Sequence, residues 1–199
     1  MQATINVACW LERSRVNGPG ERFVLWLQGC PLRCPGCWNQ EMWSFAPRTL
    51  LTVDELCEQI MDVRGIEGVT LTGGEPFAQA GPLAATAARV RAAGLSVMVF
   101  TGYELEELHD EAARALLSLT DIAVAGRFRT EERDLTLRWR GSRNQHAYFL
   151  STRYSETLLS VEEAAIEFHW RADGSVALTG FPTDELVRIG GIQPPSHCV

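Results

Sequence analysis

Three of the six cysteines of this chain fall within eight residues, directly after a nearly continuous apolar run. The run spans Phe23 to Leu27, and the cysteines are Cys30, Cys34 and Cys37, with the spacing Cys-x3-Cys-x2-Cys. An apolar run of this length is typical of a strand that is buried on both faces of a parallel sheet. The cysteines are therefore expected on a loop just after the carboxyl end of a strand.

This spacing indicates a metal centre. The N-terminus lacks a basic start and a long apolar stretch, so no export signal is expected, and clustered cysteines then favour metal over disulfides. Thiolates suit iron–sulfur clusters or zinc, but structural zinc usually takes four protein ligands. The other cysteines, Cys9, Cys57 and Cys198, lie far away in the sequence. Three thiolates on a four-iron cluster leave one iron open for chemistry. A zinc knuckle or redox thiols are the alternative.

Strand-like and helix-like segments alternate across residues 20–126. One short strand is expected over 69–72, ending at Gly73, and another over 95–100, ending at Thr101. Right-handed crossovers give a parallel sheet with helices outside, and about four such units are too few for a full barrel. The predicted fold class is α/β: a partial, open (β/α) barrel with a small C-terminal β-containing extension. The loops after the strands would then meet at one edge, where ligands bind.

Helices are expected between these strands. Thr52 and Glu55 form a capping box, which predicts a helix start. Further helices are expected over residues 82–93, closed by Gly94, and over residues 104–117.

The chain divides into a predicted core of residues 1–150 and an extension of residues 151–199. Two strand-like stretches in the extension, Ile166 to Arg171 and Ser175 to Leu178, flank the turn residues Ala172-Asp173-Gly174. This pattern predicts a β-hairpin.

The net charge and the hydrophobicity of the chain limit the classes of partner that are expected. The formal net charge is −7, so nucleic-acid binding is not expected. No stretch approaches the roughly 20 apolar residues that span a bilayer, so no membrane partner is expected. We predict a cytoplasmic location.

A second motif, Gly73-Gly74-Glu75-Pro76, follows the cysteines in the sequence. Together with the Cys-x3-Cys-x2-Cys loop and the aromatic Trp38 that follows it, this motif resembles the radical S-adenosylmethionine (SAM) superfamily. The resemblance implies a [4Fe-4S] cluster on Cys30, Cys34 and Cys37, with SAM on the open iron and no catalytic residue beyond these ligands. It implies SAM contacts from these residues: Trp38, Asn39, Thr72, Gly73, Gly74, Glu75, Pro76 and Thr101. Glu75 could orient the SAM ammonium or cap the next helix.

Other stretches resemble one subgroup, the activating enzymes of glycyl radical proteins. The turn Asn17 to Arg22 matches their Asp-Gly-Pro-Gly-x-Arg pattern, with Asn in place of Asp. The stretches GCPLRCPGCWN, FTGYELEEL, DIAVAGRF and LRWRGSRNQ are similar to the subgroup that activates anaerobic ribonucleotide reductase. The resemblance covers residues 5–150. It implies an activase that makes a glycyl radical on a partner protein, with a flavodoxin- or ferredoxin-like electron donor.

Several alternatives stay open from the sequence. One is a radical SAM enzyme that acts on a small molecule or peptide, with the extension as its lid. Another is a non-enzymatic iron–sulfur or zinc module that binds a partner and no SAM. Arg127 could be a solvated charge or could bind a carboxylate or a partner's backbone. Gln145, in the last of the stretches, could close over the site or only cap a turn.

Overall fold

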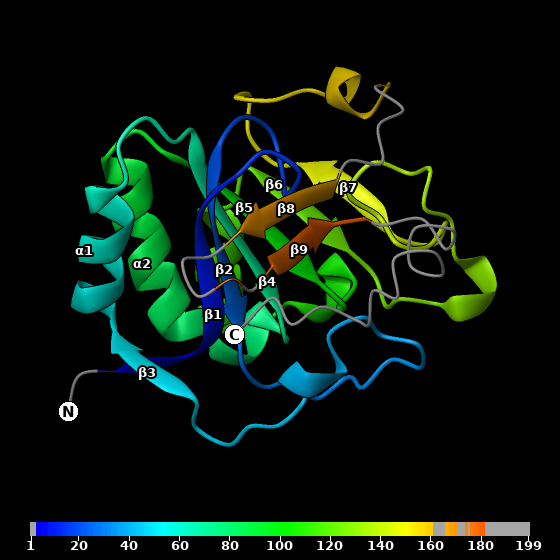
Figure 1. The fold of residues 1–199 in the computed structure, drawn as a ribbon, viewed down its shortest axis with the longest axis horizontal. Coiled ribbons are helices and arrows are strands. Elements are labelled where there is room, and N and C mark those ends of the chain that lie inside the picture. Colours follow the sequence, from blue (N-terminus) through cyan, green and yellow to red (C-terminus); the bar gives the residue numbers. More distant parts are fainter. Residues whose placement is uncertain (1–2, 161–165, 171–173, 175, 182–199) are drawn as a thin grey trace.

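A seven-stranded mixed sheet forms the centre of the protein in a computed structural model, which describes residues 3–160, 166–170, 174 and 176–181 (Figure 1). Four central strands, β2, β4, β5 and β6, are parallel, and the outer strands pair antiparallel. In sheet order, the strands are β3 (Thr49–Thr52), β1 (Thr4–Ser14), β2 (Arg22–Leu27), β4 (Gly68–Gly73), β5 (Ser96–Thr101), β6 (Ile122–Ala125) and β7 (His146–Phe149).

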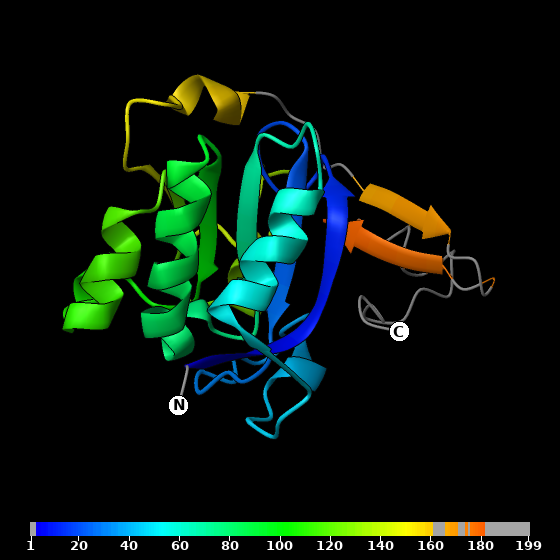
Figure 2. The same ribbon diagram turned by 90° about the vertical axis from the view of Figure 1, so that its left-hand side faces the viewer.

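Three helices cover one face of the sheet, and a separate two-stranded hairpin lies on the side of the opposite face (Figure 2). The hairpin consists of β8 (Ile166–Trp170) and β9 (Val176–Gly180). The helices are α1 (Val53–Asp62), α2 (Ala80–Ala92) and α3 (Glu111–Ser118), and the short 3-10 helices are η1 (Gln40–Met42), η2 (Pro76–Gln79), η3 (Leu105–Glu107), η4 (Thr130–Glu132) and η5 (Glu156–Ser160).

Alternation along the strands divides the core between the two faces, because successive side chains of a strand point to opposite sides. In β5, Val97 and Val99 join the large apolar cluster beneath the helices. Met98, between them, packs on the other face with Trp139. In β2, Trp26 likewise points away from the helices and contacts Met42. The strands are therefore buried on both faces, as the apolar run in β2 predicted.

The predicted α/β class, with an open sheet of parallel strands and a C-terminal hairpin, is confirmed. The capping box is also confirmed, since Thr52 Oγ1 accepts a hydrogen bond from Glu55 N and the Glu55 carboxylate accepts one from Thr52 N. The helix predicted over residues 104–117 was wrong at its start. Asp110 caps Ala113 N at 2.8 Å, so α3 begins at Glu111 and only the short η3 precedes it.

Parts of the extension lie outside the described residues. These parts are residues 161–165, 171–173, 175 and 182–199, and they include the predicted turn residues 172 and 173 and Cys198. Among the helices that the structure describes, none is long and apolar enough to cross a membrane.

Candidate iron–sulfur and cofactor site

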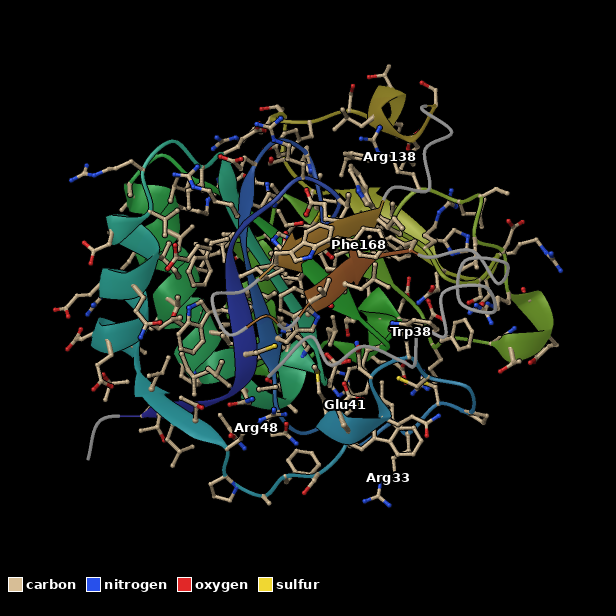
Figure 3. The ribbon with its side chains drawn as sticks, viewed as in Figure 1. Arg33, Trp38, Glu41, Arg48, Arg138 and Phe168 are labelled. Carbon is tan, nitrogen blue, oxygen red and sulfur yellow. The ribbon has the colours of Figure 1, made fainter. Side chains whose placement is uncertain are left out.

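The cysteine loop leaves the sheet at the carboxyl end of β2, as the sequence predicted. Gly29 adopts φ +102°, and its N–H donates to Met42 O at 2.8 Å. Cys30 N donates to Trp43 O at 3.2 Å, and Cys37 N donates back to Cys34 O at 3.1 Å. Arg33 extends outward from the tip of the loop (Figure 3). These bonds hold the loop against η1 and direct its three half-buried thiols to one side.

All three thiols line one cavity of about 150 Å³. Burial raises the pKa of the Cys30 and Cys37 thiols. Backbone N–H groups of Leu32 and Arg33 favour the Cys30 thiolate, and that of Asn39 favours the Cys37 thiolate. Donors aimed at sulfur are the surroundings that cluster-bound thiolates require. The loop could therefore hold an iron–sulfur cluster. Across the ranges that the structure describes, no three His, Cys, Asp or Glu side chains close around a single metal ion.

Three residues of the Gly-Gly-Glu-Pro segment, Gly73, Gly74 and Glu75, line the same cavity as the thiols. Gly73 adopts φ +95°, and Gly74 N donates to Leu27 O at 2.8 Å. A Cβ on Gly74 would lie 2.4 Å from Gly29 O, and one on Gly73 would lie 2.7 Å from Leu27 N. Both glycines line the cavity. However, the space that their missing side chains leave is filled by the backbone around the cysteine loop. The chain that approaches both glycines closely is therefore this protein's own backbone.

Glu75 joins the ends of two neighbouring strands. Its carboxylate is buried and accepts hydrogen bonds from Phe77 N at 2.9 Å, Thr101 Oγ1 at 2.8 Å and Gly102 N at 2.9 Å. Burial raises the pKa of Glu75 to about 7, although all three donors favour its charged form. The bond to Phe77 N caps η2. The helix-capping alternative is therefore observed, and the same carboxylate also faces the cavity.

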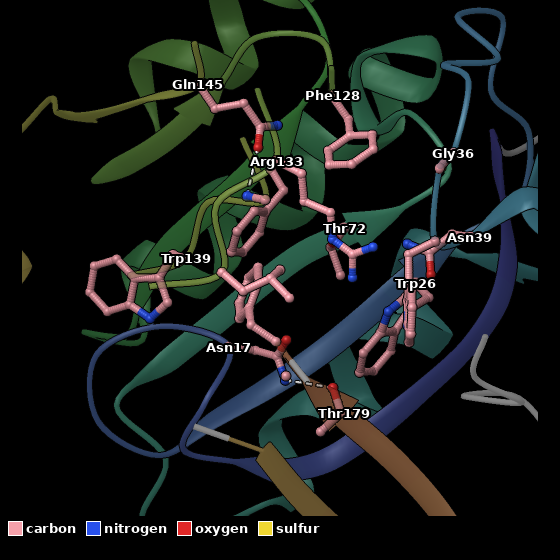
Figure 4. Close-up of a pocket in the computed structure, with 17 residues that line it drawn as sticks. Asn17, Trp26, Gly36, Asn39, Thr72, Phe128, Arg133, Trp139, Gln145 and Thr179 are labelled. Carbon is pink, nitrogen blue, oxygen red and sulfur yellow. Dashed lines mark hydrogen bonds between the residues drawn. The ribbon is translucent and has the colours of Figure 1, made fainter. Parts of the chain in front are cut away.

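Asn39 connects the thiol cavity to a second, larger one of about 230 Å³ (Figure 4). Its Nδ2 donates to Gly73 O at 3.3 Å, while its Oδ1 is buried and has no hydrogen-bond partner. A buried acceptor without a partner is costly, which suits a site that a polar ligand completes. The residues that line both cavities are Cys37, Asn39, Thr72, Phe100, Phe128 and Gln145.

The remaining predicted contacts separate into three places. Thr101 lines the thiol cavity, and its hydroxyl also accepts a hydrogen bond from Tyr103 N at 3.1 Å. Trp38 lines the larger cavity only. Pro76 is buried at the first position of η2 and lines neither cavity. The thiol cavity therefore brings together every predicted residue except Trp38 and Pro76.

The segment after β6 closes over the cysteine loop. Thr130 Oγ1 donates to Pro35 O at 2.9 Å. Gln145 Nε2 donates to Gly126 O at 2.9 Å, and its Oε1 accepts from Gly141 N at 2.8 Å. Gln145 thus both fixes a turn and lines the two cavities. Arg127 forms a two-point ion pair with the carboxylate of Glu107, at 2.7 and 2.8 Å, in a partly exposed position.

Residues 16–148 match the family described as a 4Fe-4S single cluster domain.

The chain belongs to this family.

Curated relatives of this 4Fe-4S single cluster domain protein are named anaerobic ribonucleoside-triphosphate reductase-activating proteins. The identity is 38% over 140 residues for Haemophilus influenzae, 36% over 143 residues for Escherichia coli K12 and 30% over 142 residues for Enterobacteria phage T4. These matches cover 88%, 92% and 86% of the relatives and 65%, 68% and 67% of this chain. The predicted resemblance to radical SAM activating enzymes is confirmed at the level of family. The crystal structure of QueE from Escherichia coli matches with TM-score 0.38 and 22% identity, over 51% of this chain and 53% of that one.

The family match includes all three cysteines and ends within β7, so the β8–β9 hairpin lies outside it. The sequence did not single out several residues that line the larger cavity, among them Trp26, Trp139 and Thr179. Trp26 was visible only as part of an apolar run, and strand alternation is the signal that could have assigned it to the cavity face. Nothing local marks Thr179, because its neighbours in space are distant in sequence.

Proposed function

We propose that this chain is an activase of anaerobic ribonucleotide reductase. In this proposal it cleaves SAM reductively and leaves a glycyl radical on the reductase. The observation that carries the proposal is the single cavity that three thiols share with Gly74, Glu75 and the end of β5. We infer the partner protein from the names of the relatives, since each is called an activating protein of that reductase.

The thiols of Cys30, Cys34 and Cys37 would hold a [4Fe-4S] cluster and leave one iron for SAM. Bound there, the cluster and SAM would supply reductive cleavage of SAM and abstraction of a hydrogen atom from the substrate glycine. Asn39 Oδ1 offers an unpaired acceptor to the SAM ammonium or adenine. Glu75 fixes the ends of β4 and β5 beside the thiol cavity and would orient the ammonium of a bound SAM.

The proposed activity also requires a catalytic core and an electron donor. Residues 1–150 form the catalytic core and residues 151–199 an added element. A flavodoxin- or ferredoxin-like protein donates the electron, and the cytoplasm is the expected compartment. The half-buried thiols support electron entry through the cysteine loop, whose Arg33 and Pro35 are exposed.

The test begins with anaerobic reconstitution with iron and sulfide, followed by reduction with dithionite in the presence of SAM. We expect 5′-deoxyadenosine, and a glycyl radical signal by electron paramagnetic resonance when the reductase is added. Cys34→Ala should lose both cluster and product. Cys57→Ala is the matched control, because Cys57 is buried in α1 away from the site. A Cys34→Ala protein that still binds a full four-iron cluster would overturn the ligand assignment.

A second outcome separates the alternatives. If 5′-deoxyadenosine forms but no radical appears on the reductase, the chemistry is of the radical SAM type with another substrate, such as a small molecule or peptide. If an intact cluster forms and neither binds nor cleaves SAM, the protein is a binding module.

A further inference from the structure

The β8–β9 hairpin contributes to the cavity beside the thiols. It lies on the side of the sheet away from the helices (Figures 1 and 2). The end of β9 brings Thr179, Gly180 and then Phe181 into the lining of the larger cavity. This cavity shares Cys37 and Asn39 with the thiol cavity. The hairpin therefore borders the space into which a substrate must reach.

A buried hydrogen bond holds the end of β9 in place beside the larger cavity. Asn17 Nδ2 donates to Thr179 Oγ1 at 2.9 Å (Figure 4). It also donates to Ser14 Oγ at 2.9 Å. Asn17 is 7% exposed and Thr179 is 1% exposed. The preceding residue of β9, Leu178, is also buried. At the outer end, Arg15 N donates to Glu167 Oε1 of β8 at 2.8 Å. The hairpin is thus held at both of its strands by the turn between β1 and β2.

Phe181 extends the border to the thiol cavity. Its ring lies 6.3 Å from that of Phe100, centre to centre, at 37°. It also packs on the apolar cluster that contains Met98 and Trp139. Phe100 lines both cavities, so a single ring separates Phe181 from the cavity of the thiols. Removing the Phe181 ring would widen the larger cavity, because Phe181 lines it.

We propose that residues 179–181 form a substrate-selecting wall that restricts the site to a glycine in a narrow polypeptide loop. This inference rests on the proposed function. The larger cavity, about 230 Å³, is walled in part by the aromatic side chains of Phe181, Phe100 and Trp139. It suits a length of backbone without a side chain at the reacting position. Packed aromatic walls exclude even one added carbon, because close-packed interiors yield little.

The test uses the full reconstituted chain and two forms of the reductase, with glycine or with alanine at the radical position. The readout is 5′-deoxyadenosine formed above the level without reductase. The unaltered chain should prefer the glycine form at least about tenfold, since one methylene changes discrimination by roughly 10–200-fold. Phe181→Ala should lower that preference severalfold, and Phe181→Leu, which retains more of the packing, should lower it less.

Phe168→Ala is the matched control. Phe168 belongs to the same hairpin but is 44% exposed and lines neither cavity (Figure 3). Its removal should leave the preference unchanged. Thr179→Val, which loses the acceptor for Asn17, should lower the preference, and Thr179→Ser should restore it. If the preference for the glycine form stays the same in the Phe181→Ala and Phe181→Leu proteins, residues 179–181 do not select the substrate. Absence of any reductase-dependent product from the unaltered chain instead refutes the proposed function.

Discussion

Gly74 and Gly29 pack backbone against backbone. A Cβ on Gly74 would lie 2.4 Å from Gly29 O, and that same oxygen accepts a hydrogen bond from Glu75 N at 2.9 Å. Gly29 directly precedes Cys30. The Gly-Gly-Glu-Pro segment and the cysteine loop therefore form one rigid unit, and a change in one is transmitted to the other.

The first prediction follows from this contact. Gly74→Ala should destabilise the apoprotein by about 1–3 kcal/mol, because backbone atoms cannot yield to the new methyl group. It should also reduce the iron content after reconstitution, since the displaced oxygen adjoins Cys30. Urea denaturation and iron analysis measure the two effects. Gly81→Ala is the control: Gly81 lies in α2 with open space around it, and alanine should stabilise the helix by roughly 0.5–1 kcal/mol. Unchanged iron content in Gly74→Ala would contradict the coupling.

The second prediction concerns the buried carboxyl of Glu75. Its pKa is raised from 4.5 to about 7 in the folded protein, so the folded state holds its proton more tightly than the unfolded state. The tighter binding of this proton stabilises the folded protein fully below pH 4.5, and this contribution of Glu75 is lost as the pH rises to about 7. The apoprotein should therefore lose about 3 kcal/mol of unfolding free energy across this window.

Glu75→Gln tests this pH dependence. The amide does not titrate, so the slope between pH 4.5 and 7 should flatten, whatever the absolute stability. Urea denaturation at several pH values gives both curves. Glu55→Gln, at the exposed start of α1, should keep the slope. Parallel curves for the unaltered protein and Glu75→Gln would show that another group is responsible.

The third prediction concerns Arg22, which is fully buried beneath the turn that precedes β2. Its guanidinium donates to Thr70 Oγ1 at 2.7 Å, to Ser96 Oγ at 2.8 Å and to Val69 O at 2.7 Å. Lysine cannot reproduce this planar set of donors. Arg22→Lys should cost roughly 2–4 kcal/mol, because it leaves buried acceptors unpaired. Arg15→Lys, at an exposed side chain, should change stability by less than about 0.5 kcal/mol. Equal losses in the two variants would rule out the special contribution of Arg22.

The fourth prediction concerns the unpaired acceptor of Asn39. Asn39→Ala removes Oδ1 from the junction of the two cavities. If SAM uses this acceptor, its affinity should fall about tenfold, the equivalent of one ordinary hydrogen bond. Iron content should stay unchanged, because Asn39 lies outside the thiol set. Equilibrium binding of SAM to the reconstituted protein measures the change, with the exposed neighbour Gln40→Ala as control. Unaltered affinity would exclude Asn39 as a contact.

The sequence by itself determined the parts that depend on near neighbours. The spacing of Cys30, Cys34 and Cys37, the apolar run of β2 and the capping box at Thr52 are local patterns, because a strand, a cap or a loop is set by residues a few positions apart. The convergence of Gly74 and Thr101 near the cysteines also followed, since parallel strands place their carboxyl ends at one edge.

Only the tertiary structure decided the contacts between distant segments. The position of β1 between β3 and β2, the contact of Gly74 with Gly29 and the capture of Thr179 by Asn17, 162 residues earlier, leave no periodic trace in the sequence. These contacts form when segments that are far apart in the sequence pack together and exclude water. The residue pattern within each segment does not show which other segment it will pack against. The chemistry of the site could therefore be predicted from residues 30–39 and 73–76. The shape of the space beside it depends on the hairpin and on the face of the sheet to which Trp26 and Phe100 point.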